Sequence, residues 1–149
     1  MTEVIVANDA MARLRTELAR APFHAFLELE PVSADAELGS IALRIGAKPE
    51  FRRAYDSEDW HGGVLAAVID MAAHAAVAVR IGAMAPTIDL RIDYLAPARG
   101  QLTATGTVLR AGRTIGRSDV TLRDAHGVVV ALGRGTFSCH MAPTTRAAT

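Results

Sequence analysis

The sequence predicts an α+β fold in which antiparallel strands surround one long buried helix, with a further helix at the N-terminus. Almost every side chain from about residue 61 to 80 is Ala, Val, Leu, Ile or Met, and a helix that is apolar on all sides is buried on all sides. Strand-like segments then follow one another with only short turns between them. Strands in succession without intervening helices favour an antiparallel sheet.

The N-terminal helix is predicted from the helical spacing of apolar residues over 10–20. Asn8 or Asp9 is its candidate N-cap, and Pro22 is expected to end it. Residues 48–60 are polar, charged and aperiodic, so they predict a loop before the long helix. Alternation of apolar and polar residues predicts six strands, over 26–32, 38–45, 87–95, 102–110, 114–123 and 128–139.

Composition limits the classes of protein. A chain of 149 residues, half of them apolar, is expected to form one domain over 1–149, with 1–7 and 140–149 frayed. Zero formal charge argues against nucleic acid or an anionic membrane as a partner. The single cysteine, Cys139, excludes a disulfide framework and any cysteine-rich metal site, and no metal is expected.

A cytoplasmic location is expected because the first residues, MTEVIVAND, contain no basic segment followed by an apolar run. The most apolar stretch, 63–79, is short for a membrane span and contains Asp70 and His74. We therefore expect this stretch to be the buried helix of the domain and expect no membrane partner.

Asp70 stands out on the long helix because burial of an unpaired carboxylate costs several kcal/mol. It is a candidate catalytic acid or base, or else a structural residue that faces a wet groove or accepts one hydrogen bond. His74 lies four residues later and shares the same helix face. It either titrates against and orients Asp70, or is a core or interface histidine with satisfied nitrogens.

The long helix begins with His61, Gly62 and Gly63. Amides at a helix N-terminus lack intrahelical partners and lie at its positive end, and glycine leaves them unobstructed. Such amides suit a developing oxyanion. The same two glycines are also compatible with a simple turn.

The string HGGVLAAVID (61–70) resembles the motif of hotdog-fold acyl-CoA thioesterases of the phenylacetate-pathway type. The likeness extends through TIDLRIDYLAPARG (87–100) and ALGRGTF (131–137), and so covers most of the chain. It implies a hotdog fold in which a long helix is wrapped by an antiparallel sheet and two protomers join their sheets. The substrate it implies is an acyl-CoA, and no cofactor is implied because coenzyme A is part of the substrate.

The resemblance also implies roles for individual residues. Asp70 would be the nucleophile or the general base for water, and the Gly62 amide would polarise the thioester carbonyl. His61 would shape the pocket at the helix start, and Thr87 would position the water or the acid. Relatives often have an Asn about six residues before the His, where this chain has Tyr55, and a small residue where it has His74.

Further candidate substrate-binding residues surround this motif. Tyr55 and Trp60 could stack on an aromatic acyl group or plug the loop, and Arg113 and Arg117 could pair with phosphates of coenzyme A or be solvated strand residues. The acyl group is expected between helices, where small residues leave room near Asp70. The full set of candidate substrate-binding residues is Gly63, His74, Tyr55, Trp60, Arg113 and Arg117, and the residues expected to leave room are Ala66, Ala73 and Val77.

Helix geometry predicts that the site needs two chains. Gly62 and Asp70 are eight residues apart, about 12 Å along one helix, so one thioester carbonyl cannot contact both on the same chain. Hydrolysis at a dimer interface is therefore expected, with two sites per homodimer or more in a homotetramer. The alternatives are a non-catalytic acyl-CoA-binding hotdog module, or a dehydratase in which His61 works with Asp70, although the Pro-Gly expected after that His is absent.

Overall fold

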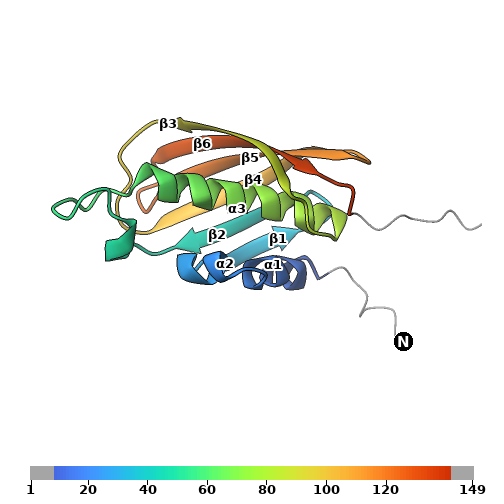
Figure 1. The fold of residues 1–149 in the computed structure, drawn as a ribbon, viewed down its shortest axis with the longest axis horizontal. Helices are drawn as coiled ribbons and strands as arrows, with labels where there is room; N and C mark the ends of the chain where they lie inside the picture. The colour runs from blue at the N-terminus through green and yellow to red at the C-terminus, as the bar shows by residue number, and fades with distance from the viewer. Residues whose placement is uncertain (1–8, 142–149) are drawn as a thin grey trace, which may run out of the picture.

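Six antiparallel strands form one curved sheet that wraps around a central helix (Figure 1). The structure is a computed structural model that describes residues 9–141. The strand order is β1-β2-β4-β5-β6-β3, and the predicted hotdog architecture is confirmed. The elements are α1 (Ala10–Ala19), α2 (Pro22–Leu27), β1 (Glu30–Asp35), β2 (Ser40–Ile45), η1 (Pro49–Phe51), α3 (Gly62–Ile81), β3 (Thr87–Tyr94), β4 (Leu102–Ala111), β5 (Ile115–Asp124) and β6 (Val129–Ser138).

The central helix, α3, is the core of the fold. Most of its side chains from Leu65 to Val79 are buried, and it packs on strands across the sheet. Along β4, β5 and β6, buried and exposed residues alternate for most of each strand, so the inner face covers α3 and the outer face is open. α3 is long and apolar enough to cross a membrane, yet 61% of its most apolar stretch is buried inside this fold. The burial agrees with the sequence-based prediction of a buried helix.

Glycines let the sheet approach α3 closely. A Cβ atom built on Gly106 of β4 would lie 2.6 Å from the Ala72 carbonyl oxygen, and one on Gly133 of β6 would lie 2.1 Å from Ile69 Cγ2. Both distances are far below an ordinary van der Waals contact. The small residues of the inner face therefore set how tightly the sheet closes on the helix.

The N-terminal region differs from the prediction in one element. The strand expected over 26–32 is wrong in its first half, because Phe26 and Leu27 belong to α2 and β1 begins only at Glu30. Pro22 does follow α1, as expected, but it also occupies the first turn of α2, where its missing N–H costs nothing. Glu28, with φ of 54°, ends α2 in the left-handed conformation.

The loop before α3 is more ordered than its polar sequence predicts. It contains η1, and its Phe51 ring is buried with the centroid 5.1 Å from that of Trp60. The only lysine of the chain, Lys48, places its ammonium over the rings of Phe26 and Phe51, 4.1 and 4.6 Å from their centroids. The rings and this cation join α2 to the loop.

The two edges of the sheet differ. α1 packs beside β1 at one edge (Figure 1). At the other edge, β3 pairs only with β6, so within residues 9–141 one side of this eight-residue strand has no strand partner. Ile88, Tyr94 and Leu95 at this edge are each more than half exposed. A long free edge with apolar residues is typical of a surface that pairs with another chain.

We expect Gly106→Ala to lower the free energy of unfolding by about 1–3 kcal/mol, because the new methyl group meets backbone rather than a flexible side chain. Urea unfolding followed by circular dichroism measures the change. Gly46→Ala is the matched control, since a Cβ there has no neighbour within 4 Å. Equal stability of the two variants would contradict the close approach of β4 to α3.

Candidate active site

The chain enters α3 through a segment held by hydrogen bonds. The Trp60 amide donates to the Ala98 carbonyl oxygen at 2.9 Å, and the His61 amide donates to the Phe51 carbonyl oxygen at 2.7 Å. The buried Asp59 carboxylate forms ion pairs with Arg53 and Arg99. These contacts fix where the first turn of α3 begins.

The amides at the start of α3 have different partners. His61 is the N-cap, and its Nδ1 accepts a hydrogen bond from the Gly63 amide at 2.9 Å. The Val64 and Leu65 amides both donate to the His61 carbonyl oxygen. Within residues 9–141, the Gly62 amide has no hydrogen-bond acceptor. Of the two glycines that the motif offers, Gly62 is therefore the free donor, whereas the Gly63 amide is occupied.

Tyr94 holds Gly62 from the neighbouring edge strand. Its hydroxyl donates to the Gly62 carbonyl oxygen at 2.8 Å. Tyr94 lies within the strand predicted over 87–95, and that prediction does not indicate this contact. Its exposed position, 54% accessible at the end of the strand, is the feature that distinguishes it from a core residue.

Asp70 lies two turns further along α3 and is only half-buried. The Thr87 hydroxyl at the start of β3 donates to Asp70 Oδ1 at 2.8 Å. This hydrogen bond occupies Oδ1 alone, and no donor within residues 9–141 contacts Asp70 Oδ2. The structure brings together Asp70 and Thr87, which the sequence analysis paired only through the family resemblance.

A cavity of about 330 Å³ opens beside Asp70. Its walls come from the α1–α2 connection, from α2, from α3 and from the segment that leads into β3, and most of the lining residues are apolar. The expected room at Ala73 and Val77 is wrong, because both are fully buried under the chain's own sheet. The lining residues are Arg20, Ala21, Phe23, His24, Leu27, Ala67, Asp70, Met71, His74, Met84, Pro86 and Thr87.

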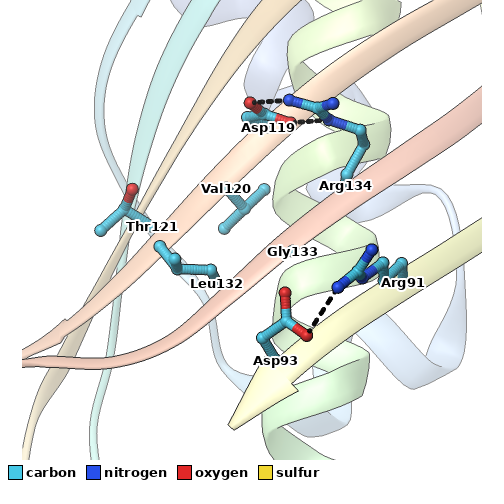
Figure 2. Close-up of a pocket in the computed structure, with 8 residues that line it drawn as sticks. All are labelled: Arg91, Asp93, Asp119, Val120, Thr121, Leu132, Gly133 and Arg134. Atoms are coloured by element: carbon cyan, nitrogen blue, oxygen red, sulfur yellow. Dashed lines mark hydrogen bonds and ion pairs between the residues drawn. The ribbon is translucent and has the colours of Figure 1, made fainter. Parts of the chain in front are cut away.

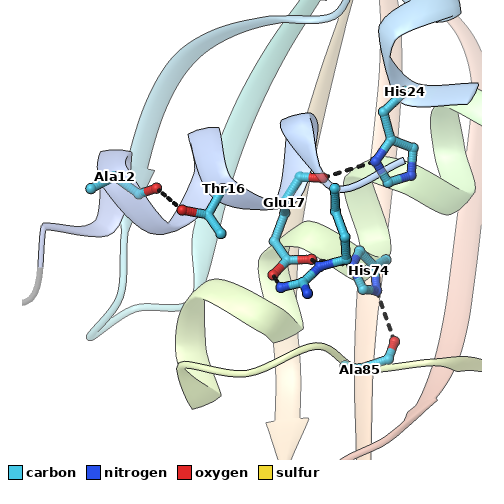
Figure 3. A network of polar contacts seen from close by, with 7 residues as sticks. Ala12, Thr16, Glu17, His24, His74 and Ala85 are labelled. Carbon is cyan, nitrogen blue, oxygen red and sulfur yellow. Dashed lines mark hydrogen bonds and ion pairs between the residues drawn. The ribbon is translucent and has the colours of Figure 1, made fainter. Parts of the chain in front are cut away.

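His74 is held at both ring nitrogens (Figure 3). Nδ1 is 2.8 Å from the Ala85 carbonyl oxygen, and Nε2 is 2.9 Å from Glu17 Oε2. Glu17 lies on α1, is 4% exposed, and also accepts from Arg20 Nε at 2.9 Å. His24 Nδ1 contacts the Glu17 carbonyl oxygen at 2.8 Å. His74 therefore has satisfied nitrogens and also stands one turn from Asp70.

The electrostatics of this group follow from its contacts. Burial raises the pKa of Glu17, but the hydrogen bonds from His74 and Arg20 outweigh it and lower that pKa to about 2. Burial likewise lowers the pKa of His74, but the contacts with Glu17 and Ala85 and the charge of Asp70 raise it above its usual value. The shift of each pKa favours the charged form of its residue, as expected for an ion pair between Glu17 and His74.

Glu17 was missed by sequence reasoning, although a signal was present. Ala10, Leu14 and Glu17 are the buried residues of α1 and follow helical spacing, so Glu17 occupies the apolar face. A carboxylate on a buried face requires a partner. The sequence singles out His74 on the long helix but does not link it to Glu17.

The remaining candidate residues lie apart from Asp70. The Tyr55 side chain is fully exposed in the loop, whereas Trp60 is 5% exposed and donates from Nε1 to the Gly100 carbonyl oxygen. Trp60 thus plugs the loop, the second of its two expected roles. Arg113 is exposed in the β4–β5 turn, and Arg117 is exposed on the outer face of β5, opposite α3.

A second hollow, of about 340 Å³, lies on the outer face of the sheet (Figure 2). Arg134 donates from two nitrogens to the Asp119 carboxylate, at 2.6 and 2.8 Å, and Arg91 pairs with Asp93 at 3.4 Å. Its acids are therefore paired, and the sheet separates it from α3. No cluster of three or more His, Cys, Asp or Glu side chains able to hold a metal ion occurs within residues 9–141.

Comparison with known proteins decides the family. The family model described as "Thioesterase superfamily" matches residues 58–131, which include the start of α3, Asp70 and Thr87. A medium/long-chain acyl-CoA thioesterase of Salmonella typhimurium, YigI, is 35% identical, with 92% of this chain and 98% of that protein covered. This chain belongs to the thioesterase superfamily. It is a thioesterase with the hotdog fold.

Other relatives agree with this assignment. A candidate esterase of Halobacterium salinarum is 35% identical over 143 residues, covering 88% of this thioesterase and 93% of that protein. A crystal structure from the thioesterase superfamily has 30% identity and a TM-score of 0.81, covering 87% of this chain and 97% of that one. The Escherichia coli PaaI structure, from the phenylacetic acid degradation operon, has a TM-score of 0.77, but at 24% identity the likeness concerns the fold alone.

We expect Glu17→Gln to destabilise the thioesterase by about 3 kcal/mol near pH 6, because it leaves His74 buried without its counter-ion. The raised pKa of His74 gives stability that is full below its unfolded value and is lost as pH rises through the folded value. The lowered pKa of Glu17 gives stability that is lost as pH falls from 4.5 towards about 2.

Urea unfolding of Glu17→Gln and the wild type across pH measures this difference. The loss of stability should be largest between the two titrations and should shrink on both sides. A difference that stays constant from about pH 3 to about pH 10 would contradict a charged pair.

Proposed function

We propose that this thioesterase hydrolyses acyl-CoA thioesters at a site formed by two chains. The observation on which the proposal rests is the free Gly62 amide at the start of α3, on the same helix as the Thr87-bound carboxylate of Asp70. An oxyanion donor and a carboxylate base are two groups that together can carry out thioester hydrolysis. The similarity to YigI, named as a medium/long-chain acyl-CoA thioesterase, supports an acyl-CoA substrate.

The two groups are too far apart to act together on one chain. Gly62 is the first residue of α3 and Asp70 the ninth, which places them about 12 Å apart along the axis. The free edge of β3 and its exposed Ile88 and Leu95 support pairing with a second copy of the chain. A two-fold axis would bring Asp70 of each protomer to Gly62 of its partner and create two equivalent sites.

The proposed reaction begins at the thioester carbonyl. Asp70 accepts a proton from water, and the resulting hydroxide adds to the carbonyl carbon while the oxygen takes the negative charge. The partner's Gly62 amide donates to this oxyanion. Collapse of the intermediate breaks the C–S bond, and the thiolate of coenzyme A leaves and takes up a proton. Direct attack by Asp70, through an acyl-enzyme anhydride that water then hydrolyses, uses the same two residues.

The acyl group is assigned to the cavity beside Asp70. Phe23 and Leu27 of α2, Met71 of α3 and Met84 give it an apolar wall, which suits a medium-length aliphatic or an arylacetyl chain. The arylacetyl alternative follows the phenylacetate-type resemblance of the motif. Arg113 and Arg117 remain candidates for the phosphates, and no cofactor beyond the coenzyme A of the substrate enters the reaction.

We expect Asp70→Asn and Asp70→Ala to lower kcat by about 100-fold or more, because the base is lost while the fold is retained. Free-thiol release from short, medium, long and arylacetyl-CoA substrates measures the change and identifies the preferred acyl class. Asp119→Asn is the matched control, since Asp119 is also held by hydrogen bonds but lies on the outer face of the sheet. Unchanged turnover in both Asp70 variants would refute the assignment. Binding of acyl-CoA without turnover by the wild type would favour a binding module.

We expect an inactive Asp70→Asn chain and an inactive Gly62→Pro chain to restore activity when mixed. Proline is tolerated at the first position of a helix and removes only the N–H, and His61 already has the extended conformation that precedes proline. A mixed dimer holds one site with both groups intact, so it should recover about half the wild-type rate.

Refolding the two chains together and purifying the mixed dimer through two different tags allows this rate to be measured. A mixed dimer as inactive as its parents, with dimerisation shown by light scattering, would mean that both groups act on the same chain.

A further inference from the structure

His74 faces two oxygen acceptors and no donor among residues 9–141. Its Nδ1 contacts the Ala85 carbonyl and its Nε2 contacts the Glu17 carboxylate. A carbonyl oxygen and an ionised carboxylate accept hydrogen bonds and cannot donate them. A neutral imidazole has one N–H, so one of the two contacts would bring two lone pairs together. Arg20 donates to both oxygens of Glu17 and thereby favours its ionised form. With Glu17 ionised, only the imidazolium satisfies both contacts.

The imidazolium and its two partners belong to three different parts of the fold. Glu17 is on α1, His74 is on α3, and Ala85 is in the segment that joins α3 to β3. Ala85 is fully buried, so its carbonyl group is held in place. Two residues later comes Thr87, whose hydroxyl donates to Asp70 Oδ1 at 2.8 Å. A displacement of Ala85 would therefore move the donor that orients Asp70.

We propose that His74, as an imidazolium paired with Glu17, is a positioning residue that holds the Ala85–Thr87 segment and thereby keeps the Thr87 hydroxyl on Asp70. The inference rests on the proposed catalytic role of Asp70. It makes the docking of α1 a condition for full turnover, although no residue of α1 takes part in the reaction. The functional site thus includes α1, which lies outside the motif of residues 61–70.

The charged groups around His74 decide how this arrangement responds to pH. α1 contributes Glu17, which is paired with Arg20 just after the end of this helix; α2 contributes His24 at the cavity wall and α3 contributes Asp70. From β6 the neighbour is the uncharged ring of Phe137. Glu17 is the carboxylate in direct contact with the ring. Loss of one His74 proton at alkaline pH leaves a single N–H for two acceptors, so one of the two contacts is lost and the segment that holds Thr87 loosens.

The protonation of His74 is measured on the wild-type protein. Nitrogen-15 NMR of histidine-labelled enzyme should show both ring nitrogens of His74 protonated at neutral pH, with a titration midpoint above that of a free histidine. The His74 signal is assigned from its absence in His74→Gln. A neutral ring with a single N–H at neutral pH would overturn the proposal, whatever the activity of any variant.

The effect on turnover is measured with Glu17→Gln, because Glu17 does not line the cavity. We expect kcat to fall about tenfold, since small displacements of reacting groups cost one to two orders of magnitude, while KM changes little. Glu37→Gln, an exposed glutamate in the β1–β2 turn, is the matched control with unchanged kcat. A folded Glu17→Gln enzyme with wild-type kcat would overturn the proposal.

The pH profile separates positioning from a merely structural role. In the wild type, kcat should decline at alkaline pH with the midpoint found by NMR, and His74→Gln should lack this decline. Failure of the proposed function gives a different result, namely Asp70 variants that retain activity while His74 is still seen as an imidazolium. An alkaline decline that persists unchanged in His74→Gln would assign it to another group and overturn the proposal.

Discussion

The burial of α3 inside the curved sheet is the constraint on which the rest of the structure depends. The helix has polar side chains at few positions, and the sheet reaches it closely at Gly106 and Gly133. A helix covered on most of its circumference can expose a functional group only where the sheet leaves a gap. Asp70 lies at such a place, half-buried beside the cavity. The same packing that stabilises the domain thus limits where chemistry can occur.

The gap beside Asp70 is bordered by α2 and by its connection to α1, which lie outside the motif of residues 61–70. α1 packs on α3, and α2 provides the wall of the cavity formed by Phe23 and Leu27. The ion pair between Glu17 and His74 fastens α1 to α3. Each charge of a buried pair is costly to bury without the other. α1 is therefore held by a contact that depends on both residues and on pH.

The long helix and the strands after it could be predicted from the sequence, because their patterns extend over eight or more residues. The helix expected over about 61–80 is Gly62–Ile81, and the strand expected over 87–95 is Thr87–Tyr94. The segment 26–32 failed because its period-two pattern is short, and Pro22 began a second helix instead. Local pattern could not reveal that Phe26 packs against Phe51.

The residues of the candidate site that lie on one helix could be predicted from the sequence. The contacts that join segments far apart in the sequence could not. Asp70 and Gly62 stand on one helix within a recognisable motif. Glu17 is 57 residues from His74, and Tyr94 is 32 residues from Gly62. Hydrophobic periodicity shows which face of a helix or strand is buried, but not which distant residue that face contacts. An acid on an apolar helix face nevertheless indicates that a partner exists.

Lys48 offers a chemical probe of the contact between α2 and the loop before α3. It is the only lysine of the chain, and its ammonium lies over the rings of Phe26 and Phe51 and contacts the Phe26 carbonyl oxygen. The Lys48 side chain is 21% exposed, and its nitrogen is held by these contacts and by Glu28. Movement of α2 away from the loop releases the nitrogen and speeds its acylation. The rate of modification at this residue therefore reports how firmly α2 is held, and the fifteen arginines of the chain offer no competing lysine side chain.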